Sequence, residues 1–246
     1  AGPSFVPLLM ALGFGKPVVV EHHGFQTACP NGLLFYEPTQ TPCPGHFMAR
    51  RYGECLRCNA RQGKWRSLKL WLLTFPRRWM CQRVARNIVP TNWLGEVLEL
   101  PRTTTILHGI GAQADRAGGQ MLRRPATFVF LGRLVSTKGA HVLLEAAHRL
   151  TQKGLAVRIH IIGDGPERRN LEAQAGALGL RDHITFHGYL PPEELEEVLA
   201  GAAAMVIPSL GGEVFGLVAA ENMLKGRLPI VSSLGSLAEV VGEAGL

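Results

Sequence analysis

Short apolar runs alternate with helical patterns through the second half of the chain. The strand-like runs lie at residues 127–131, 156–162, 183–187, 205–208 and 228–232. Each is followed by a loop and then by a helical pattern, and the segment 192–200 begins with proline and acidic residues, as helices commonly do. Strands that alternate with helices at this spacing pack as a parallel sheet with helices on both faces. The pattern therefore predicts an α/β fold whose ligands bind at the carboxyl ends of the strands.

The first half shows a less complete pattern of the same kind. A helix is predicted at residues 4–12 and a buried strand at 17–20, followed by the tetrapeptide EHHG. Towards the end of this half, the pattern predicts a strand at 87–90, a helix at 93–100 and a strand at 103–107. These elements make only part of a sheet.

The pattern divides the chain into two domains and a linker. Residues 1–108 form the first domain, 109–124 the linker and 125–246 the second domain. Inside the first domain, residues 25–61 are rich in proline, glycine and cysteine. Connections of this length are uncommon in compact domains, so this segment is either functional or mobile.

Composition narrows the class of protein. With 246 residues, 46% of them hydrophobic and 18% charged, the chain is globular rather than disordered or fibrous. No apolar run approaches the roughly 20 residues that a spanning helix needs, and the first ten residues lack the basic start of a signal peptide. We therefore expect a cytoplasmic protein. Because the chain starts on Ala1 and stops on Leu246 directly after a strand-and-helix pattern, we also expect a fragment that is truncated at both ends.

The net charge of +7 is unevenly distributed. Residues 1–125 carry 16 Lys and Arg against 6 Asp and Glu, whereas residues 126–246 carry 10 against 13. This asymmetry implies that the two domains have different partners.

The basic residues of the first domain are interleaved with tryptophans. Within 64–86 there are seven Lys and Arg and no acid, with Trp65, Trp71 and Trp79 among them. Basic residues and indoles both favour an anionic membrane surface, so we expect this segment to dock on the cytoplasmic face of a membrane. Because Pro76 interrupts the pattern, two short helical pieces are expected. In the alternative interpretation, the aromatic side chains face the domain core and the cations are merely solvated.

The loop after the first strand of the second domain contains two cations five residues apart, Arg133 and Lys138. A diphosphate would find a helix N-terminus and two charge-assisted donors there. A solvated turn with glycine-permitted backbone angles explains the loop equally well. Two other loops are weaker candidates. The glycines of 163–167 permit a ligand to approach the backbone closely, and the backbone of 188–191 could meet a nucleobase edge.

The loop at 208–217 carries the most chemical information. Glu213 and Glu221 are separated by seven residues, and residues 215–217 lie where a helix starts, so that their amides could receive a phosphate. Glu221 lies among apolar residues and is predicted to be buried, where sugar hydroxyls would satisfy its charge. In the alternative interpretation, Glu221 pairs with a cation or reaches solvent and Glu213 merely favours the helix N-terminus.

These motifs resemble those of a known family. GRLVSTKG, IIGDGPE, ITFHGYLPPEEL, VIPSLGGEVFGLVAAENM and LPIVSSLGSLAEVV are similar, in order and spacing, to the nucleotide-sugar domain of retaining GT-B glycosyltransferases of family 4, glycosyl transferases group 1. KPVVVEHHG, IVPTNWLGEVL and TTTILHGI resemble the acceptor domain more loosely, with His108 in place of the usual asparagine. The resemblance implies two Rossmann-like doubly wound domains, both incomplete in this chain.

The resemblance also implies roles for particular residues. His23 would lie near the reaction centre, although the adjacent His22 leaves the register open by one, and Glu213 would lie beside the transferred sugar. The implied donor-binding residues are Arg133 and Lys138 for the diphosphate, Phe215, Gly216 and Leu217 through backbone amides, Glu221 for the ribose and Leu190 for the base.

The predicted function is transfer of a hexose-type sugar from a nucleoside diphosphate sugar to a glycan, lipid-linked or other cell-envelope acceptor. Positioned cations would stabilise the leaving diphosphate. The three aspartates, at 115, 164 and 182, form no close pair for a divalent ion, so the reaction is expected to need neither metal nor cofactor. The resemblance, rather than the residues, implies retention of configuration.

Two other classes of function remain open at this point. An epimerase of the same fold would use the same donor site. A phosphorylase would need a cofactor lysine, and Lys225 is the only lysine in the last ninety residues. A zinc-stabilised nucleic-acid-binding module would explain the basic segment and the cysteines. It would leave the loop with Glu213 and Glu221 unexplained, so no nucleic-acid partner is expected.

Four of the five cysteines fall in residues 25–61, and only one pair has C-x-x-C spacing. They are Cys29, Cys43, Cys55 and Cys58, with His46 as a substitute ligand. A structural zinc site is one interpretation, and free thiols or a redox pair are the alternatives. Disulfides are disfavoured by the expected cytoplasmic location.

Overall fold

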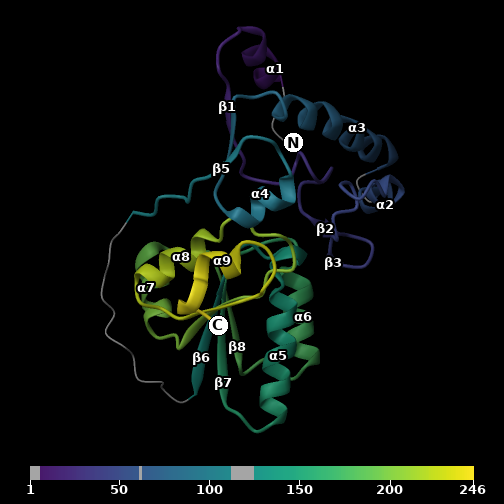
Figure 1. Ribbon diagram of the computed structural model, residues 1–246. Coiled ribbons are helices and arrows are strands. Elements are labelled where there is room, and N and C mark those ends of the chain that lie inside the picture. Colours follow the sequence, from purple (N-terminus) through teal and green to yellow (C-terminus); the bar gives the residue numbers. More distant parts are fainter. Residues whose placement is uncertain (1–5, 61–62, 112–124) are drawn as a thin grey trace. The chain divides into compact units, whose positions relative to one another are not determined.

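The structure is a computed structural model that describes residues 6–60, 63–111 and 125–246. The chain divides into two compact units (Figure 1). The first unit comprises Ala1–Gly109 and Gly211–Phe215, and the second comprises Ile110–Leu210 and Gly216–Leu246. Most of the predicted linker, residues 112–124, lies outside the described residues.

The second unit contains a five-stranded sheet in which every pairing is parallel. Its strand order is β10-β9-β6-β7-β8. The strands are β6 (Ala126–Leu131), β7 (Val157–Ile162), β8 (Ile184–Gly188), β9 (Ala204–Ile207) and β10 (Pro229–Val231). The predicted parallel α/β fold is confirmed, and each of the five strands lies within two residues of its predicted bounds.

Helices cover both faces of this sheet, because successive strand residues point to opposite sides. Phe130 and Ile161 lie in the core on one face of the sheet. Figure 1 shows α5 (Ala140–Gln152) and α6 (Arg168–Ala177) covering that face. Val129 and Ile162, one residue away, pack on the other face. The helices on that face are α7 (Pro192–Ala200), α8 (Leu217–Leu224) and α9 (Leu237–Val241). Two short 3-10 helices complete the unit, η2 (Ser136–Lys138) and η3 (Gly242–Ala244).

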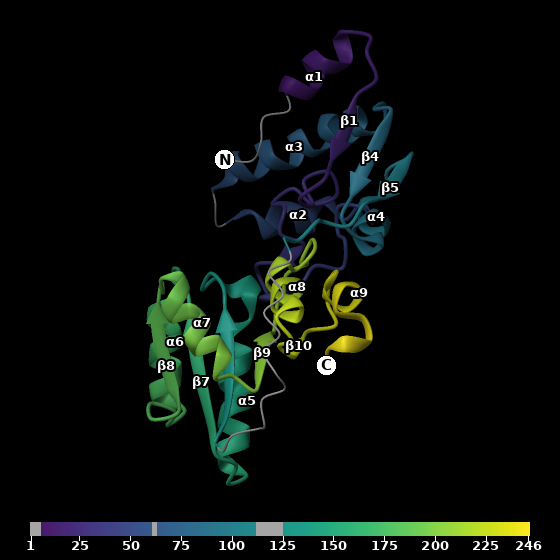
Figure 2. The same cartoon turned by 90° about the vertical axis from the view of Figure 1, so that its left-hand side faces the viewer.

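The first unit has a smaller parallel sheet of order β1-β4-β5, whose strands lie side by side in Figure 2. The strands are β1 (Val19–Glu21), β4 (Arg86–Val89) and β5 (Thr103–Thr105), and the helices beside them are α1 (Val6–Gly13) and α4 (Asn92–Leu98). The N-cap of α4 is Thr91, whose side chain accepts a hydrogen bond from the amide of Leu94.

The segment 25–61 contains little regular structure. A hairpin of two-residue strands, β2 (Phe35–Tyr36) and β3 (Thr41–Pro42), is followed by the seven-residue helix α2 (Tyr52–Cys58). The rest of the segment consists of turns and irregular backbone. Its conformation must therefore be held mainly by side chains.

The basic segment forms one continuous helix, α3 (Lys64–Cys81), so the prediction of two short pieces is wrong. Pro76 lies inside the helix and removes a single backbone hydrogen bond. Packing offsets that loss, because the rings of Trp71 and Phe75 both contact Tyr52, with centroids 5.6 Å from it in each case. Among the described residues, no helix is both long and apolar enough to cross a membrane.

Candidate functional site

Backbone hydrogen bonds connect the loops that follow β6, β7 and β8 in the second unit. The amide of Leu134 donates to the carbonyl of Asp164 at 2.9 Å, and the amide of Glu167 donates back to Leu134 at 3.0 Å. The amide of Gly163 donates to the carbonyl of Gly188, the last residue of β8, at 2.7 Å. Three of the loops singled out from the sequence therefore lie together at the carboxyl edge of the sheet.

The loop after β9 joins the same edge. The amide of Leu210 donates to the carbonyl of Thr137 at 2.8 Å. Gly139, with a φ of +69°, lies so close that a Cβ on it would be 1.9 Å from the carbonyl oxygen of Pro208. Only glycine fits this position, because any side chain would overlap backbone atoms that cannot move aside.

The two predicted phosphate-binding cations lie in the loop after β6. Arg133 is exposed and, among the described residues, its side chain has no hydrogen bond or ion pair. Lys138 is half-buried and ends η2, directly before Gly139 and α5. The loop thus presents one solvated and one partly enclosed cation at the edge where ligands bind in this class of fold.

The N-terminus of α8 is the second element that could bind an anion. Its N-cap is Gly216, at a φ of +93°, and Leu217 is the first helical residue. The first amides of a helix have no partner within it and lie at the positive end of its dipole. A Cβ on Gly216 would lie 2.6 Å from a methyl carbon of Leu237, so glycine also allows α9 to approach here.

Glu221 is exposed on α8, so the prediction that it is a buried charge is wrong. The buried residues of this helix are Ala219 and Asn222. The apolar residues Leu217 and Leu224 are exposed, at 46% and 42%, which means that the apolar composition of α8 does not reflect burial on all sides. Among the described residues, the Glu221 carboxylate makes no hydrogen bond or ion pair.

Leu190 lies between β8 and α7. Its side chain packs on the face of the sheet that α7 and α8 cover. The next residue, Pro191, is the N-cap of α7 in an extended conformation. The side chain anchors the loop, and the backbone of Leu190 follows the carboxyl end of β8.

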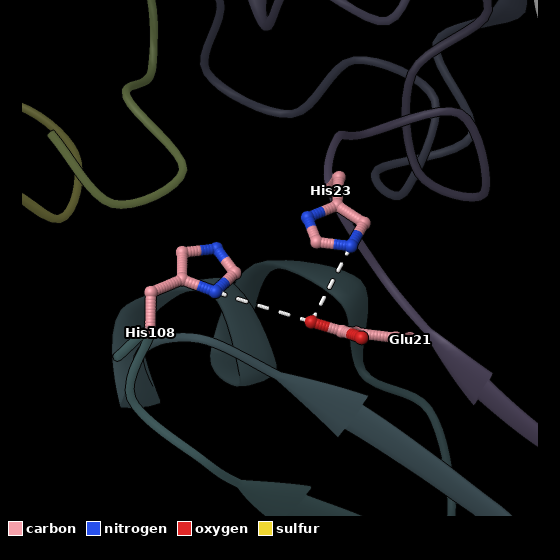
Figure 3. Close-up of side chains that lie close together, drawn as sticks. All are labelled: Glu21, His23 and His108. Atoms are coloured by element: carbon pink, nitrogen blue, oxygen red, sulfur yellow. Dashed lines mark ion pairs between the residues drawn. The ribbon is translucent and has the colours of Figure 1, made fainter. Parts of the chain in front are cut away.

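In the first unit, Glu21, His23 and His108 come together at the carboxyl ends of β1 and β5 (Figure 3). Nε2 of His23 lies 3.3 Å from Oε1 of Glu21, and Nδ1 of His108 lies 3.9 Å from the same oxygen. The two imidazole rings stack with centroids 5.3 Å apart and planes 7° apart. One carboxylate oxygen therefore lies near a ring nitrogen of each histidine.

The structure distinguishes the two adjacent histidines. His22 is buried, and its Nε2 lies 2.9 Å from Oδ1 of Asn87. Burial lowers the pKa of His22, against the hydrogen bond to Asn87. His23 is exposed, so of the two histidines it alone is open to a ligand.

The segment Gly211–Phe215 belongs to the first unit, so Glu213 and Phe215 lie in the first unit whereas Gly216, Leu217 and Glu221 lie in the second. The ring of Phe215 packs edge-on against His108, with centroids 5.0 Å apart. Glu213 is half-buried in this segment.

Sequence analysis did not identify Glu21 as a member of this group. A signal was present, because Glu21 ends β1 and His23 follows two residues later, a spacing that in extended backbone puts both side chains on the same side. No periodicity in the sequence could have identified His108 as a member, because it follows β5 rather than β1. Among the described residues, these three form the one group of metal-ligating side chains whose ligand atoms all lie within 4.8 Å of one another.

Lys225 has a structural partner. Its Nζ contacts Glu196 of α7, which also binds Arg227. Although partial burial opposes it, the hydrogen bonds from Arg227 and Lys225 hold the pKa of Glu196 below its usual range. The role of Lys225 as an ion-pair partner gives no support to phosphorylase chemistry.

Comparison with known proteins gives similar sequences and folds. Residues 113–245 match the family described as Glycosyl transferases group 1. The 2-deoxystreptamine glucosyltransferase of Streptomyces kanamyceticus is 32% identical over 114 residues, which are 46% of this chain and 29% of that protein. The D-rhamnosyltransferase WbpZ of Pseudomonas aeruginosa is 37% identical over 126 residues, which are 50% of this chain and 32% of that protein. The chain thus spans about a third of the length of these curated relatives.

The solved structures support the same fold. Anabaena HepE in complex with UDP and glucose superposes with a TM-score of 0.64 at 17% identity, over 98% of this chain and 60% of that protein. Sucrose-phosphate synthase from Thermosynechococcus elongatus gives a TM-score of 0.58 at 23% identity, over 72% of this chain and 48% of that protein. Since the family match covers more than half of the chain, the chain belongs to the glycosyl transferases group 1 family, with the GT-B fold.

Proposed function

We propose that the protein transfers a hexose-type sugar from a nucleoside diphosphate sugar to a glycan or lipid-linked acceptor of the cell envelope, with retention of configuration. The observation that carries the proposal is the convergence of the post-strand loops at one edge of the second unit's sheet. That edge presents Arg133, Lys138 and the N-terminus of α8. Two cationic side chains and the positive end of a helix dipole, held on hydrogen-bonded loops, suit a diphosphate better than a neutral ligand.

The proposed chemistry is departure of the nucleoside diphosphate from the sugar. As the glycosidic bond breaks, negative charge accumulates on the diphosphate, and cations held in place beforehand stabilise it without rearranging. We propose that Arg133 and Lys138 do this, and that the amides of 215–217 bind phosphate or sugar. Because the sequence offers no close aspartate pair, the reaction proceeds without a bound divalent ion.

The remaining contacts are proposed for the residues that the family resemblance singles out. The Glu221 carboxylate would accept hydrogen bonds from the ribose hydroxyls, and the backbone of Leu190 would meet the base. His23 and Glu213 would lie beside the transferred sugar. Glu21 faces Nε2 of His23, which leaves Nδ1 of that ring available to a ligand.

Donor binding is tested with a thermal-shift panel of UDP, GDP, ADP and dTDP, followed by product analysis with the labelled sugar of the nucleotide that stabilises most. Sugar transferred to an acceptor supports the proposal. A changed sugar that remains on the nucleotide would identify an epimerase instead. Undiminished transfer in the presence of EDTA is expected from the metal-independent mechanism.

We further propose that the full protein docks on an anionic membrane through α3, which gives access to a lipid-linked acceptor. Trp65 is 86% exposed, and Lys64, Arg66 and Lys69 are exposed around it. Trp71 packs against Tyr52 instead. The docking proposal therefore concerns the exposed residues around Trp65, and the packing interpretation concerns Trp71.

Not every cation of α3 suits a docking test. The guanidinium of Arg78 donates to the carbonyls of Leu98 and Glu99, at 2.6 and 3.0 Å, and so caps the end of α4. A variant with both Arg66→Gln and Lys69→Gln avoids this structural role. Each basic residue near an anionic surface contributes about 1 kcal/mol, so vesicle binding should fall roughly 30-fold.

The measurement is co-sedimentation with anionic and with neutral liposomes. Lys153→Gln, which removes an exposed cation from the second unit, is the matched control and should bind as the wild type does. Equal recovery with both kinds of vesicle, unchanged in the double variant, would contradict docking and leave a soluble acceptor.

A further inference from the structure

The segment 25–61 brings four cysteines from three places in the sequence to one cavity. Cys29 lies in a turn before β2, Cys43 directly follows β3, and Cys55 and Cys58 lie one turn apart on α2. All four line the same cavity, whose other lining residues are Ala28, Pro30, Asn31, Tyr36, His46, Phe47 and Asn59. Cysteines scattered at random over an irregular segment would not converge in this way.

Local hydrogen bonds hold two of the sulfurs in place. Sγ of Cys29 lies 2.9 Å from Oδ1 of Asn31, and Nδ2 of the same amide donates to Sγ of Cys58 at 3.3 Å. The amide of Gly32 donates to the carbonyl of Cys29 at 3.0 Å, which closes the turn. The amide of Cys43 donates to Leu34 at 3.0 Å and extends the hairpin. Side-chain and backbone hydrogen bonds together thus place Cys29, Cys43 and Cys58 around the cavity.

The cavity also contains polar atoms without a partner. Nδ1 of His46 and Oδ1 of Asn59 are buried and, among the described residues, make no hydrogen bond. Such atoms are costly in a folded protein and usually indicate a missing ligand or water. They are a second observation, independent of the cysteines, that points to a bound species here.

The chemistry of the lining favours a cation as that species. Four cysteine side chains line one cavity. Thiols become strong ligands when a divalent cation binds, because coordination deprotonates them.

We propose that the segment 25–61 is a structural zinc site with Cys29, Cys43, Cys55 and Cys58 as its four ligands. Four thiolates at about 2.3 Å in a tetrahedron are a common structural zinc site. Among the described residues, no three of these sulfurs lie within 4.8 Å of one another, so the proposal requires them to draw inwards on binding. The metal would supply stability that the segment lacks, because two-residue strands and a two-turn helix bury little apolar surface.

Zinc content of the purified full protein tests this inference without reference to transferase activity. Prepared without chelator, the wild type should contain one zinc ion per chain by elemental analysis. Each of the four cysteine-to-serine variants should lose most of that zinc. Cys81→Ser is the matched control and should retain it, because Cys81 is buried in α3 and does not line the cavity.

A cobalt titration keeps the test decisive if a serine variant fails to fold. The metal-free wild type, titrated with Co²⁺ alone, should develop the thiolate-to-cobalt charge-transfer absorption of a tetrahedral site. His46→Ala should bind cobalt as the wild type does. Loss of binding in His46→Ala with retention in Cys43→Ser would overturn the four-cysteine ligand set.

Two further outcomes would contradict a zinc site altogether. One is a wild type that takes up neither zinc nor cobalt under reducing conditions. The other is mass-spectrometric detection of a Cys55–Cys58 disulfide in protein alkylated at the moment of lysis. Either result would leave a redox pair or free thiols as the explanation of the cavity.

Discussion

The two units build their candidate sites from different parts of the chain. In the second unit, backbone hydrogen bonds and close glycine contacts set the edge at which Arg133 and Lys138 are displayed. In the first unit, the exposed side chains of Glu21 and His23 meet half-buried His108 through contacts of 3.3 and 3.9 Å. A backbone-built site tolerates side-chain changes but not changes of glycine, whereas a side-chain cluster has the opposite sensitivity.

The largest effect is expected from Gly139→Ala, which tests the backbone-built edge. The new Cβ would lie 1.9 Å from the carbonyl oxygen of Pro208, at a φ of +69°. Left-handed strain and overlap together should lower the free energy of unfolding by roughly 3 kcal/mol or more. Chemical denaturation measures the loss.

Gly154→Ala is the control for that variant. Gly154 has a similar φ of +74°, but nothing lies within 4 Å of its hypothetical Cβ. Its replacement should therefore cost only the backbone strain, about 1–2 kcal/mol. Equal losses in the two variants would show that the close approach of the loops contributes nothing to stability.

The next effect in size concerns the cations that the edge displays. Arg133→Ala and Lys138→Ala should each weaken nucleoside diphosphate binding roughly tenfold or more, because a charge-assisted contact is worth about 1.5–3 kcal/mol. Isothermal calorimetry on the folded variants gives the affinity. Arg149→Ala, at an exposed position near the end of α5, should bind as the wild type does. Unchanged affinity in both site variants would remove the phosphate assignment.

Much of the second unit could be predicted from its sequence. Apolar runs and acidic, proline-led helix starts are local signals, and α7 has the bounds predicted for it, Pro192–Ala200. The exposure of Glu221 could not be predicted, because composition does not say which face of α8 meets the sheet. The continuity of α3 through Pro76 depends on packing by Trp71 and Phe75, which propensity does not register.

The site of the first unit was harder to predict, because it depends on how strands distant in the sequence lie in the sheet. The cluster in Figure 3 needs the register of β1 and the position of β5, two strands that are separated in the sheet by β4. A search for motifs identified His23 but not the carboxylate of Glu21 that lies near it. A sequence pattern can point to a site that one loop's own residues make, but it does not show which parts distant strands supply.

One buried histidine in each unit should make the free energy of unfolding depend on pH. His22 in the first unit and His160 in the second both have a lowered pKa, caused mainly by burial. The unfolded chain therefore binds protons first as the pH falls below about 6.5, and stability decreases from there towards the folded pKa. Above that range neither histidine affects stability through its charge.

Unfolding curves at several pH values from neutral to mildly acidic measure this effect. His22→Gln keeps a hydrogen-bond donor to Asn87 and removes the titration, so its stability should depend less on pH than that of the wild type. His160→Gln should remove the contribution of the second unit, where His160 lies 2.7 Å from a ring nitrogen of His187. A wild-type curve that is flat across this range would contradict both assignments.

The smallest effect on stability is expected from Glu221→Gln, and it separates ligand binding from folding. Since Glu221 is exposed and makes no hydrogen bond or ion pair among the described residues, the free energy of unfolding should change by less than about 0.5 kcal/mol. Binding should still weaken, because an amide oxygen accepts from ribose hydroxyls less strongly than a carboxylate does. Calorimetry measures the affinity for the nucleoside diphosphate and for inorganic pyrophosphate, which has no ribose. Only the affinity for the nucleoside diphosphate should fall. Glu145→Gln is the matched control, because Glu145 is exposed on α5 and makes no hydrogen bond or ion pair among the described residues. A large loss of stability in Glu221→Gln with unaltered nucleotide affinity would assign Glu221 to the fold and leave the ribose without its proposed partner.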